Sequence, residues 1–586
     1  MIAAREIRRR EPNSALYLPD SLHPVLRRVL AARIQEPENP LVLTLKDLLP
    51  PTGLRNIDTA AELIAEAVMR QQRILIVGDF DADGATSTAL SVRSLRAMGA
   101  MDVRYLVPNR FEYGYGLSPE IVELALRESP DLLITVDNGI SSLDGVAAAN
   151  HAGVPVVITD HHLPGATLPA AAALVNPNLP GCNFPSKHLA GVGVAFYVMS
   201  AVRQRLEAAG WFNTDRPKPN LAKYLDLVAL GTVADVVPLD RNNRILVEQG
   251  LRRIRAGAAA PGLLSLFAVC GRDYRRAVSS DLGFAIGPRL NAAGRLDCMS
   301  IGIECLLADE PAKARVLAEQ LDQLNRERQE IEQSMRQEAD AQLETLREKL
   351  SRQDSARLPA ALVLYDPTWH QGVIGILAGR VKERWHRPTI VFAEDSDGML
   401  KGSGRSIPGL HLRDALEIVD ARHPGMISKF GGHAMAAGLS LPTAALPAFK
   451  QAFVAVVEEL VSEEDLVGVI LSDGPLQAAE ITLELAELLR VSIPWGQHFP
   501  EPVFDGVFDI QKVVPIGGGR HQRLELRPAG ATGQPLEAVM FNTREDELPA
   551  GRRWHIAYKL GVNTFRGLSR CQLMIEYACL PADMVG

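Results

Sequence analysis

The sequence contains little that would indicate a secreted, disulfide-stabilised or membrane-spanning protein. It has six cysteines in 586 residues and no Cys-x-x-Cys pair, and a chain of this size needs no disulfides, so we expect reduced core thiols. No apolar run approaches the roughly 18 residues of a membrane-spanning helix. The opening residues, MIAAREIRRREP, lack the hydrophobic segment of a secretory signal. We therefore expect a globular cytoplasmic protein that does not contact a membrane.

The charge balance excludes one class of DNA-binding protein and leaves another open. The net charge is −8, which argues against a protein that coats DNA uniformly but is compatible with a local basic groove. Hydrophobic side chains make up 47% of the chain and charged ones 23%. At about 150 residues per domain, this length predicts three or four domains.

What the sequence does contain is a set of acidic and histidine side chains at predicted strand ends. The segments are GDFDADGATS at 78–87, VDNGIS at 136–141 and TDHHLP at 159–164, and each follows a short apolar run typical of a buried strand. Strands and helices alternate from about 57 to 165, which predicts a parallel sheet. Because ligands bind at the carboxyl ends of such strands, we expect these side chains to meet at one edge.

So many carboxylates in one place indicate a metal site. They would repel one another unless divalent cations lay among them, and an oxygen-rich set with one or two imidazoles suits Mg²⁺ or Mn²⁺ better than Zn²⁺. Two ions about 4 Å apart would favour hydrolysis of a phosphodiester or phosphoanhydride. The carboxylates concerned are Asp79, Asp81, Asp83, Asp137 and Asp160, with Asp235 in the segment GTVADVVPLD as a further candidate.

Simpler interpretations exist for each residue taken alone. One aspartate at a strand end is more often a helix cap or turn former, and one histidine is more often structural; repetition at three strand ends favours a shared site. A phosphate-cradling loop at 78–87 is excluded because the required lysine is missing and the glycine spacing is wrong. GVG at 191–193 and GSG at 402–404 lack a complete dinucleotide-binding fingerprint.

Beyond residue 186 the pattern changes three times. Residues 186–310 are mainly helical, with two predicted loops at 231–240 and 287–297. Residues 311–350 carry an apolar stripe at helical spacing, which predicts a helix of up to about 40 residues, roughly 60 Å long, that either bridges two lobes or packs as an ordinary exposed helix. A second α/β unit follows from 361 and ends in FGGHAMAAGLSL at 430–441.

The last part of the chain reads as a small antiparallel barrel or sandwich, because short alternating runs follow one another from about residue 500. Residues 512–570 contain ten lysines and arginines against five acidic residues. Trp554, Tyr558 and Phe565 could stack on bases while the arginines follow phosphates. The alternative is a β domain with a solvated basic face and aromatic residues in its core.

Five motifs together resemble the DHH phosphoesterase superfamily: GDFDADGATS, VDNGIS, TDHHLP, GTVADVVPL and, from the associated DHHA1 domain, FGGHAMAAG. Their order, the long connector and the β domain make the whole chain similar to the bacterial single-strand-specific DNA exonucleases of this superfamily. The resemblance implies an α/β fold in which a parallel-sheet DHH domain is joined by a long helix to an α/β DHHA1 domain, followed by a β-barrel OB-fold domain. The domain limits we predict are an N-terminal segment at 1–50, the DHH catalytic domain at 51–310, the connector helix at 311–352, the DHHA1 domain at 353–460 and the OB-fold nucleic-acid-binding domain at 461–586.

By the same resemblance, the protein would remove nucleotides from the 5′ end of single-stranded DNA, yielding 5′-mononucleotides in recombination and repair, with two Mn²⁺ or Mg²⁺ ions. His162 would be a further ligand or would position the phosphate, and Asp160 would instead orient a histidine. The implied metal ligands are Asp79, Asp81, Asp83, Asp137, His161 and Asp235, and the implied catalytic residues are His161, His162 and Asp137.

The resemblance also suggests groups that hold the substrate, for which the alternative is surface salt bridging. Implied partners are single-stranded DNA, a single-strand-binding protein and a helicase, and we expect a monomer. The implied substrate-binding residues are Arg110, Arg289, Asn291, Arg295, Ser403, Arg405 and His433.

Two rival functions stay open at this point. A phosphoesterase of the same superfamily, acting on short oligonucleotides, cyclic dinucleotides or pyrophosphate, would explain the metal site but would not need the last 120 or so residues. A DNA-binding module that lost its metals would keep the fold without the chemistry, although the full ligand set argues against this. The sequence predicts no function for the first fifty residues.

Overall fold

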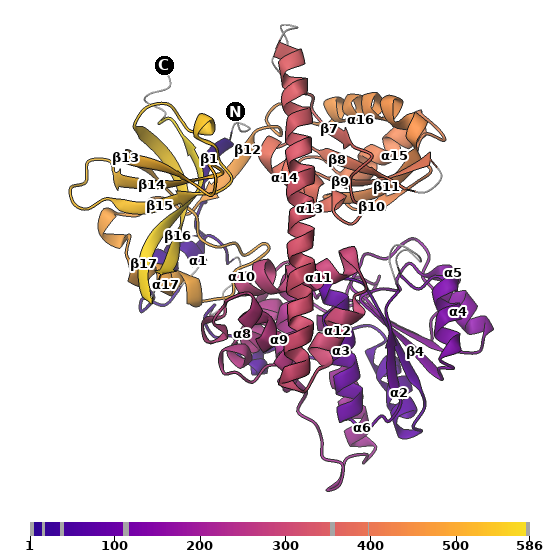
Figure 1. The fold of residues 1–586 in the computed structure, drawn as a ribbon. Coiled ribbons are helices and arrows are strands. Elements are labelled where there is room, and N and C mark those ends of the chain that lie inside the picture. The colour runs from indigo at the N-terminus through magenta and orange to yellow at the C-terminus, as the bar shows by residue number, and fades with distance from the viewer. Residues whose placement is uncertain are drawn as a thin grey trace.

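The computed structural model describes residues 5–13, 18–34, 40–108, 116–351, 358–395, 398–565 and 567–581. One long helix, α13 (Pro311–Ser351), runs through the middle of the molecule (Figure 1). A lobe with a parallel sheet surrounds its lower end, a second α/β lobe lies at the upper right, and a barrel lies at the upper left. This arrangement confirms the predicted fold class.

The lower lobe is built on a five-stranded sheet in which all neighbouring strands are parallel, in the order β3-β2-β4-β5-β6. Its inner strands are apolar throughout because helices cover both faces of a parallel sheet, and every residue of β2, β4 and β5 is buried. The strands are β2 (Ile74–Gly78), β3 (Val103–Leu106), β4 (Leu132–Val136), β5 (Val156–Thr159) and β6 (Ala173–Val175). The helices interleaved with them are α2 (Ile57–Met69), α3 (Ala82–Ala97), α4 (Pro119–Arg127), α5 (Leu143–His151) and α6 (Gly191–Ala208).

Of the two loops predicted in the helical part of this lobe, the one at 287–297 is wrong, and the one at 231–240 is correct only for residues 235–240. Residues 231–234 end helix α7 (Leu225–Ala234), and residues 287–296 form helix α11 (Gly287–Leu296). Their glycines suggested loops, but these glycines sit at close contacts: a Cβ at Gly294 would lie 1.8 Å from the carbonyl oxygen of Phe80. Tertiary packing here overrides the low helix propensity of glycine. The other helices of this part are α8 (Arg241–Arg255), α9 (Pro261–Val269), α10 (Ser279–Asp281) and α12 (Ser300–Leu307).

Helix α13 is a strut between lobes. Its lower turns contribute Ala318 and Leu321 to the core of the lower lobe, whereas Met335, Ala339 and Leu343 belong to a separate core with helix α14 (Ile374–Trp385). Because one rigid helix is buried at both ends in different cores, it fixes the distance between the lobes. Among the described residues, none of the helices combines the length and apolar character that crossing a bilayer requires.

The upper right lobe contains a mixed five-stranded sheet in the order β10-β11-β9-β8-β7. A Cβ at Gly402 would lie 2.5 Å from the ring of Phe392, so this strand position accepts only glycine without a shift of the core. The strands are β7 (Leu362–Tyr365), β8 (Thr389–Glu394), β9 (Met399–Arg405), β10 (Lys429–Gly432) and β11 (Ala436–Pro442), and the further helices are α15 (Leu412–Arg422) and α16 (Leu446–Leu460).

The C-terminal part is a closed barrel in the order β13-β14-β15-β17-β16. Trp554 and Tyr558 are 2% and 1% exposed, because alternate residues of β16 face the barrel interior. The prediction that these two aromatic residues stack on bases is therefore wrong, and the side chain of Phe565 lies outside the described residues. The strands are β13 (Phe504–Ile516), β14 (His521–Pro528), β15 (Leu536–Met540), β16 (Arg553–Phe565) and β17 (Leu568–Cys579). All six cysteines are free.

The N-terminal segment, for which the sequence predicted no function, packs against the strand that leads into the barrel. Strand β1 (Arg5–Arg9) pairs in parallel with β12 (Gly468–Ser472), the strand that leads into the barrel. Arg33, just after α1 (Pro24–Ala31), forms a fully buried ion pair with Asp473, with contacts of 2.5 and 2.9 Å. Distant parts of the chain thus hold the start of the barrel in place.

A second polar cluster joins the same elements around Asp505 of β13. Arg9 donates to its carboxylate at 2.9 Å, Ser472 at 2.5 Å, and His555 lies 3.0 Å away. Burial alone would raise the pKa of Asp505, but the hydrogen bonds from His555, Arg9 and Ser472 outweigh it and hold the pKa well below its usual range. The carboxylate is therefore charged at all physiological pH values.

The protein should lose stability as the pH rises from about 6.5 to about 9. The hydrogen bond to Asp505 is the main reason why the pKa of His555 is raised from 6.5 to about 9. Because the folded state holds this proton more tightly than the unfolded chain, its stabilisation is complete below pH 6.5 and is lost as the pH passes through about 9. Allowing for partial exposure, we expect a loss of about 2 kcal/mol.

Urea unfolding at a series of pH values measures this loss. The variant His555→Gln keeps a polar side chain without the titrating proton, so its free energy of unfolding should change less over the same pH range. An equally steep fall in the variant would assign the effect to other groups.

Candidate metal centre

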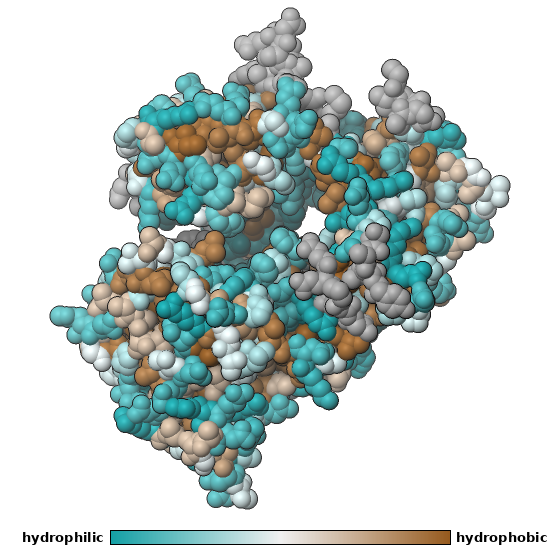
Figure 2. Space-filling model, turned by 180° about the vertical axis from the view of Figure 1, so that it is seen from behind, coloured by the Kyte–Doolittle hydropathy of each residue, from teal (hydrophilic) through white to brown (hydrophobic). Residues whose placement is uncertain are grey.

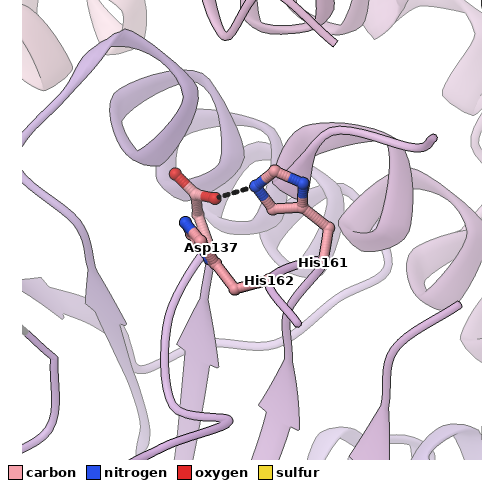
Figure 3. Close-up of side chains that lie close together, drawn as sticks. All are labelled: Asp137, His161 and His162. Atoms are coloured by element: carbon pink, nitrogen blue, oxygen red, sulfur yellow. Dashed lines mark ion pairs between the residues drawn. The ribbon is translucent and has the colours of Figure 1, made fainter. Parts of the chain in front are cut away.

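The parallel strands bring three aspartates to one edge of the lower sheet. Asp79, Asp137 and Asp160 directly follow β2, β4 and β5, which are adjacent in the sheet and point the same way. All three are at most 5% exposed. In Figure 3, Asp137 lies at the end of its strand and faces His161 from the neighbouring strand end. The predicted gathering of these residues at one edge is observed.

Asp81 begins helix α3. It is the N-cap residue, and its Oδ1 accepts a hydrogen bond of 2.9 Å from the backbone N–H of Gly84. Gly84 lies in the first turn of this helix. A Cβ there would lie 2.5 Å from the carbonyl oxygen of Asp79, so the glycine allows the helix to start directly against the strand end.

Asp83 links helix α3 to helix α6. Its two carboxylate oxygens accept hydrogen bonds from the N–H groups of Gly191 and Val192, at 2.6 and 2.9 Å. Burial, followed by the charge of Asp81, nevertheless raises the pKa of Asp83 to about 7. An unshielded carboxylate at this position is therefore poorly stabilised by the protein alone.

Asp137 is held in an unfavourable backbone conformation. Its φ of +61° lies in the left-handed region, which costs free energy for a residue other than glycine and persists where the surrounding structure enforces it. A Cβ at Gly191 would lie 2.6 Å from the carboxylate of Asp137, so the first residue of α6 must be glycine for the carboxylate to fit. Such local strain is typical of functional sites.

His161 points a ring nitrogen at two carboxylates. Its Nε2 lies 3.1 Å from Oδ1 of Asp137 and 3.5 Å from Oδ2 of Asp235, the residue that ends α7. Burial and the charge of His162 lower the pKa of His161 to about 4, while the ring also interacts with the backbone of Leu189. Because a neutral ring that donates through Nδ1 presents a lone pair at Nε2, that nitrogen and the two carboxylates form a set of donor atoms suited to a cation.

Asp160 and His162 form a separate pair. The Oδ1 atom of Asp160 lies 2.8 Å from Nδ1 of His162 and also accepts from the backbone N–H of His161, while its Oδ2 accepts from Ile140. Burial alone would raise the pKa of Asp160, but His162 outweighs it and lowers this pKa. Burial alone would likewise lower the pKa of His162, but Asp160 raises it to about 9. His162 is therefore a cation at neutral pH.

The donor atoms fit a pair of divalent ions. Among the described residues, three sets each bring three donor atoms within 4.8 Å of one another, and Asp137 and His161 are each shared by two sets. Burial, then Asp83 and Asp81, raise the pKa values of Asp137 and Asp235 well above their usual range. In the part of the chain that the structure describes, Oδ2 of Asp235 and Nε2 of His161 are buried and take part in no hydrogen bond. The sets are Asp137, His161 and His162; Asp83, His161 and Asp235; and Asp79, Asp81 and Asp137.

Three of the predicted substrate-binding residues lie on helix α11. Arg289 forms an ion pair of 2.8 Å with Asp322 of helix α13. Oδ1 of Asn291 accepts a hydrogen bond of 2.7 Å from the N–H of Ala82, next to the metal centre. Arg295 donates to the carbonyl oxygen of Gly372, just before α14, at 3.2 Å. This helix therefore connects the acidic cluster to the upper right lobe.

Three other predicted residues come from the upper right lobe, and the last falls outside the described residues. Arg405 donates to Oγ of Ser403 at 3.2 Å and to the carbonyl of Gly404 at 2.8 Å, and burial lowers its pKa. Burial, then the charges of Arg405, His411 and His162, lower the pKa of His433. His433 and His162 therefore share one electrostatic environment across the two lobes. Arg110 lies in 109–115, which the structure does not describe.

Sequence reasoning missed the residues that hold the two histidines in place. Asn178 donates to the carbonyl of His161 at 2.6 Å, and Asn176 donates to the carbonyl of His162 at 2.8 Å. Both follow β6, the next strand of the same sheet. A fourth polar segment at the same sheet edge was therefore available as a signal, in the residues NPN at 176–178.

The upper right lobe approaches the metal centre from above. From behind, the molecular surface is hollowed between the lower lobe and the α/β lobe at the upper left of that view (Figure 2). The hydrogen bond between Arg295 and Gly372 joins the two lobes. Helix α11, which contacts Ala82 beside the metal centre, therefore lies at the junction between the lobes.

Three family models match consecutive parts of the chain. The DHH family N-terminal domain matches residues 73–232, the DHHA1 domain matches 359–463 and the RecJ OB domain matches 472–577. The first match contains four of the acidic residues of the metal centre, and the other two cover the upper right lobe and the barrel. The order agrees with the predicted architecture.

Known proteins are similar over almost the whole chain. The single-stranded-DNA-specific exonuclease RecJ of Escherichia coli is 54% identical over 576 residues, which cover 97% of this chain and 98% of that protein. The protein of the same name from Haemophilus influenzae is 52% identical, covering 95% and 96%.

Solved structures show the same fold. RecJ from Thermus thermophilus in complex with Mn²⁺ has a TM-score of 0.77 at 31% identity, covering 98% of this chain and 80% of that one. Its complex with Mg²⁺ has a TM-score of 0.72 at 29% identity, covering 98% and 79%. With relatives of this identity over nearly their entire length and three family models in matching order, this chain belongs to the RecJ family of single-stranded-DNA-specific exonucleases.

Proposed function

We propose that this protein hydrolyses single-stranded DNA from the 5′ end to 5′-mononucleotides, using two Mn²⁺ or Mg²⁺ ions, in DNA recombination and repair. The observation that supports the chemistry is the convergence of Asp137, His161 and Asp235. Nε2 of His161 lies 3.1 Å from Oδ1 of Asp137 and 3.5 Å from Oδ2 of Asp235. The observation that carries the substrate is the similarity to exonucleases of that specificity along the whole chain. The 5′ polarity is supported by the motif resemblance.

The proposed ligands divide into two adjacent sets, one containing Asp137 and the other containing His161, and the set of Asp137, His161 and His162 links them. Asp79 and Asp81 complete one set, and Asp83 and Asp235 complete the other. When bound, divalent ions at these positions act as Lewis acids on the scissile phosphate and on the attacking water. The strained backbone of Asp137 and the neutral ring of His161 keep the donor atoms oriented toward this space before substrate arrives.

His162 has a different proposed role. Asp160 keeps it protonated through a contact of 2.8 Å and raises its pKa to about 9, and its side chain is 44% exposed. A cationic imidazole at the rim of the site can hold a phosphate oxygen and, during cleavage, donate a proton to the leaving oxygen. We assign it to positioning and protonation rather than to the metal set, because a protonated imidazole has no lone pair for a metal ion.

The substrate phosphates would lie between the two lobes. We propose that Ser403, Arg405 and His433 contact the phosphates from the upper right lobe, whereas Asn291 and Arg295 do so from helix α11, which contacts both lobes. Arg289 would act indirectly, because Asp322 holds its guanidinium. Arg110 stays a predicted phosphate contact. A junction of this kind would admit one strand more readily than a duplex.

The cellular setting is also a proposal. A free 5′-ended strand arises when a helicase separates DNA, and single-strand-binding protein covers such strands, so we propose both as partners. We further propose that the protein acts in the cytoplasm and as a monomer; the monomer is supported by candidate ligand sets that are complete within the described part of one chain.

A phosphoesterase specific for short substrates is the main rival. Removing the barrel after about residue 465 would have been the direct test, but β1 pairs with β12 and Arg33 is buried against Asp473. The core of the barrel is also continuous with that of the lower lobe. Truncation would therefore disturb the fold, and the full chain must be assayed on substrates of different length.

The decisive assay uses a long single strand labelled at its 5′ end or at its 3′ end. With Mn²⁺, we expect the 5′ label to appear at once as a mononucleotide and the 3′ label to be released only after complete digestion. A blunt duplex of the same sequence should be degraded far more slowly, and chelation should stop the reaction. Early release of the 3′ label would overturn the polarity, preference for dinucleotides would favour the rival phosphoesterase, and absence of cleavage would indicate a binding module.

A further inference from the structure

A second cleft, remote from the metal centre, lies between the connector helix and the barrel. It has a volume of about 750 Å³ and is bordered by α13, by α14 and by the ends of β14 and β15 (Figure 1). None of its lining residues belongs to the metal centre. All of its lining side chains are polar or charged, and six of them are arginines: Arg328, Arg336, Arg380, Arg384, Arg520 and Arg544.

Only some of these arginines are neutralised. Glu332 forms ion pairs with Arg328 at 2.9 Å and with Arg380 at 3.1 Å. Arg384 lies 3.5 Å from Asp340 and 2.6 Å from Glu547. Arg380 also lies 3.5 Å from Glu383. Four carboxylates therefore face six guanidinium groups, which leaves this cleft a positive charge on a protein whose net charge is −8.

The other three arginines have no carboxylate within ion-pair distance in the part of the chain that the structure describes. The guanidinium of Arg520 donates to the carbonyl of Gly517, at 3.2 Å. Arg336 is half-buried, and burial together with Arg384 and Arg380 lowers its pKa despite the attraction of Asp340. Arg544 lines the cleft from the barrel side, and its charge acts to lower the pKa of Asp340 against the burial that raises it. Excess positive charge that is partly desolvated is a binding site for anions.

We infer that this arginine cleft binds the phosphodiester backbone of the single strand outside the metal centre. The inference rests on the proposed function, because it places the remainder of the strand whose end is cleaved. Guanidinium groups match phosphate oxygens through paired hydrogen bonds, and a chain of phosphates can contact arginines on several elements at once. The connector helix would then be part of the DNA track as well as a strut.

The lining favours nucleic acid over an acidic protein segment. Protein interfaces depend on apolar and aromatic anchors buried at their centre, and this cleft provides none. A phosphate backbone needs only cations and hydrogen-bond donors. His521 is a further donor, because its Nδ1 accepts from the N–H of Asn542 at 3.0 Å, which leaves the proton of the neutral ring on Nε2.

The test compares the double variant Arg336→Gln/Arg520→Gln with the wild type in DNA binding without divalent metal, over a range of salt concentrations. Each lost phosphate contact makes the slope of log K against log salt shallower by about 0.7 for a single strand. We therefore expect a change of about 1.4 and roughly tenfold weaker binding for strands of about 30 nucleotides. Strands of about 4 nucleotides, which we expect to occupy the metal centre alone, should bind the double variant as tightly as they bind the wild type.

Two further variants make the result specific. Arg315→Gln/Arg422→Gln removes the same charge from exposed, ion-paired positions elsewhere and should leave the slope unchanged. Arg336→Lys/Arg520→Lys should retain most of the wild-type slope. An unchanged slope in the glutamine variant would overturn the inference and would favour an acidic protein as the partner of this cleft. Equal weakening for short and long strands would also overturn it, because it would indicate a general structural effect of the substitutions.

Failure of the proposed function gives a different pattern. The wild type could cleave no DNA with Mn²⁺ while the salt slope of the glutamine variant is shallower as expected. In that case the cleft binds strands, and only the proposed activity is refuted. If short strands are cleaved normally by every variant and the slope does not change, the activity stands and the cleft does not bind DNA.

Discussion

Replacing Asp137 with Asn is expected to lower the turnover number on single-stranded DNA by about a thousandfold or more, which corresponds to about 4 kcal/mol of transition-state stabilisation. Asparagine has the same shape and tolerates the left-handed backbone at φ +61°, so the change removes charge without rebuilding the loop. Affinity for a long strand should change by less than about twofold, because tracking and chemistry use different groups. Single-turnover kinetics and binding measurements on the same strand separate the two effects.

The matched control is Asp144→Asn, an exposed aspartate in the first turn of α5, the helix that follows the same loop. It should keep wild-type turnover. The metal-free Asp137→Asn protein should also melt at a higher temperature than the metal-free wild type, because a buried repulsive charge has gone. Retained turnover in Asp137→Asn would remove this residue from the metal set.

The largest effect on stability is expected at the buried ion pair between the N-terminal segment and the barrel. Replacing Asp473 with Ala should lower the free energy of unfolding by about 3–5 kcal/mol, because it leaves the guanidinium of Arg33 buried without its counter-charge. Both side chains are 1% exposed, and Asp473 also accepts from the N–H of Val503 at 3.0 Å. Equilibrium unfolding in urea measures the loss.

Two comparisons show whether burial is the cause. Asp20→Ala breaks an ion pair with Arg27 in the same segment, whose side chains are 81% and 41% exposed, and should cost at most about 1 kcal/mol. Adding Arg33→Met to Asp473→Ala should recover part of the loss, since the unpaired charge is removed. A cost for Asp473→Ala no larger than that for Asp20→Ala would refute the role given to the N-terminal segment.

The strand ends were predictable because parallel sheets leave strong patterns. Short apolar runs followed by Asp79, Asp137 and Asp160 suffice to place these carboxylates at one edge, whatever the details of packing. The long helix was predictable for a similar reason, since its apolar stripe continues over many turns. The domain limits drawn from the sequence stay predictions.

Contacts between distant segments were not predictable from local patterns. Gly231 and Gly294 looked like loop residues, yet each lies in a helix at a contact too close for any side chain. Trp554 and Tyr558 could have faced DNA or the barrel interior, and the side of the strand that is buried depends on how the barrel closes. Residues close together in the sequence do not determine which distant segments pack against them.

The sequence predicted that the candidate ligands gather at one sheet edge, but it did not predict the groups that support them. The N–H groups of Gly191 and Val192 and the amides of Asn176 and Asn178 orient Asp83 and the two histidines. Backbone donors carry no sequence signal, and the asparagines lie on a segment whose strand, β6, has only three residues. The assignment of each phosphate-binding residue stays a prediction.

The central claim is that the cluster of buried carboxylates exists to bind divalent ions. Isothermal titration of metal-free protein with Mn²⁺ tests it most directly, with the Asp137→Asn variant titrated alongside. We expect the wild type to take up two ions per chain, and the variant to bind them more weakly or to take up fewer. If the wild type takes up none, the carboxylates are not a metal site and the proposed chemistry is wrong.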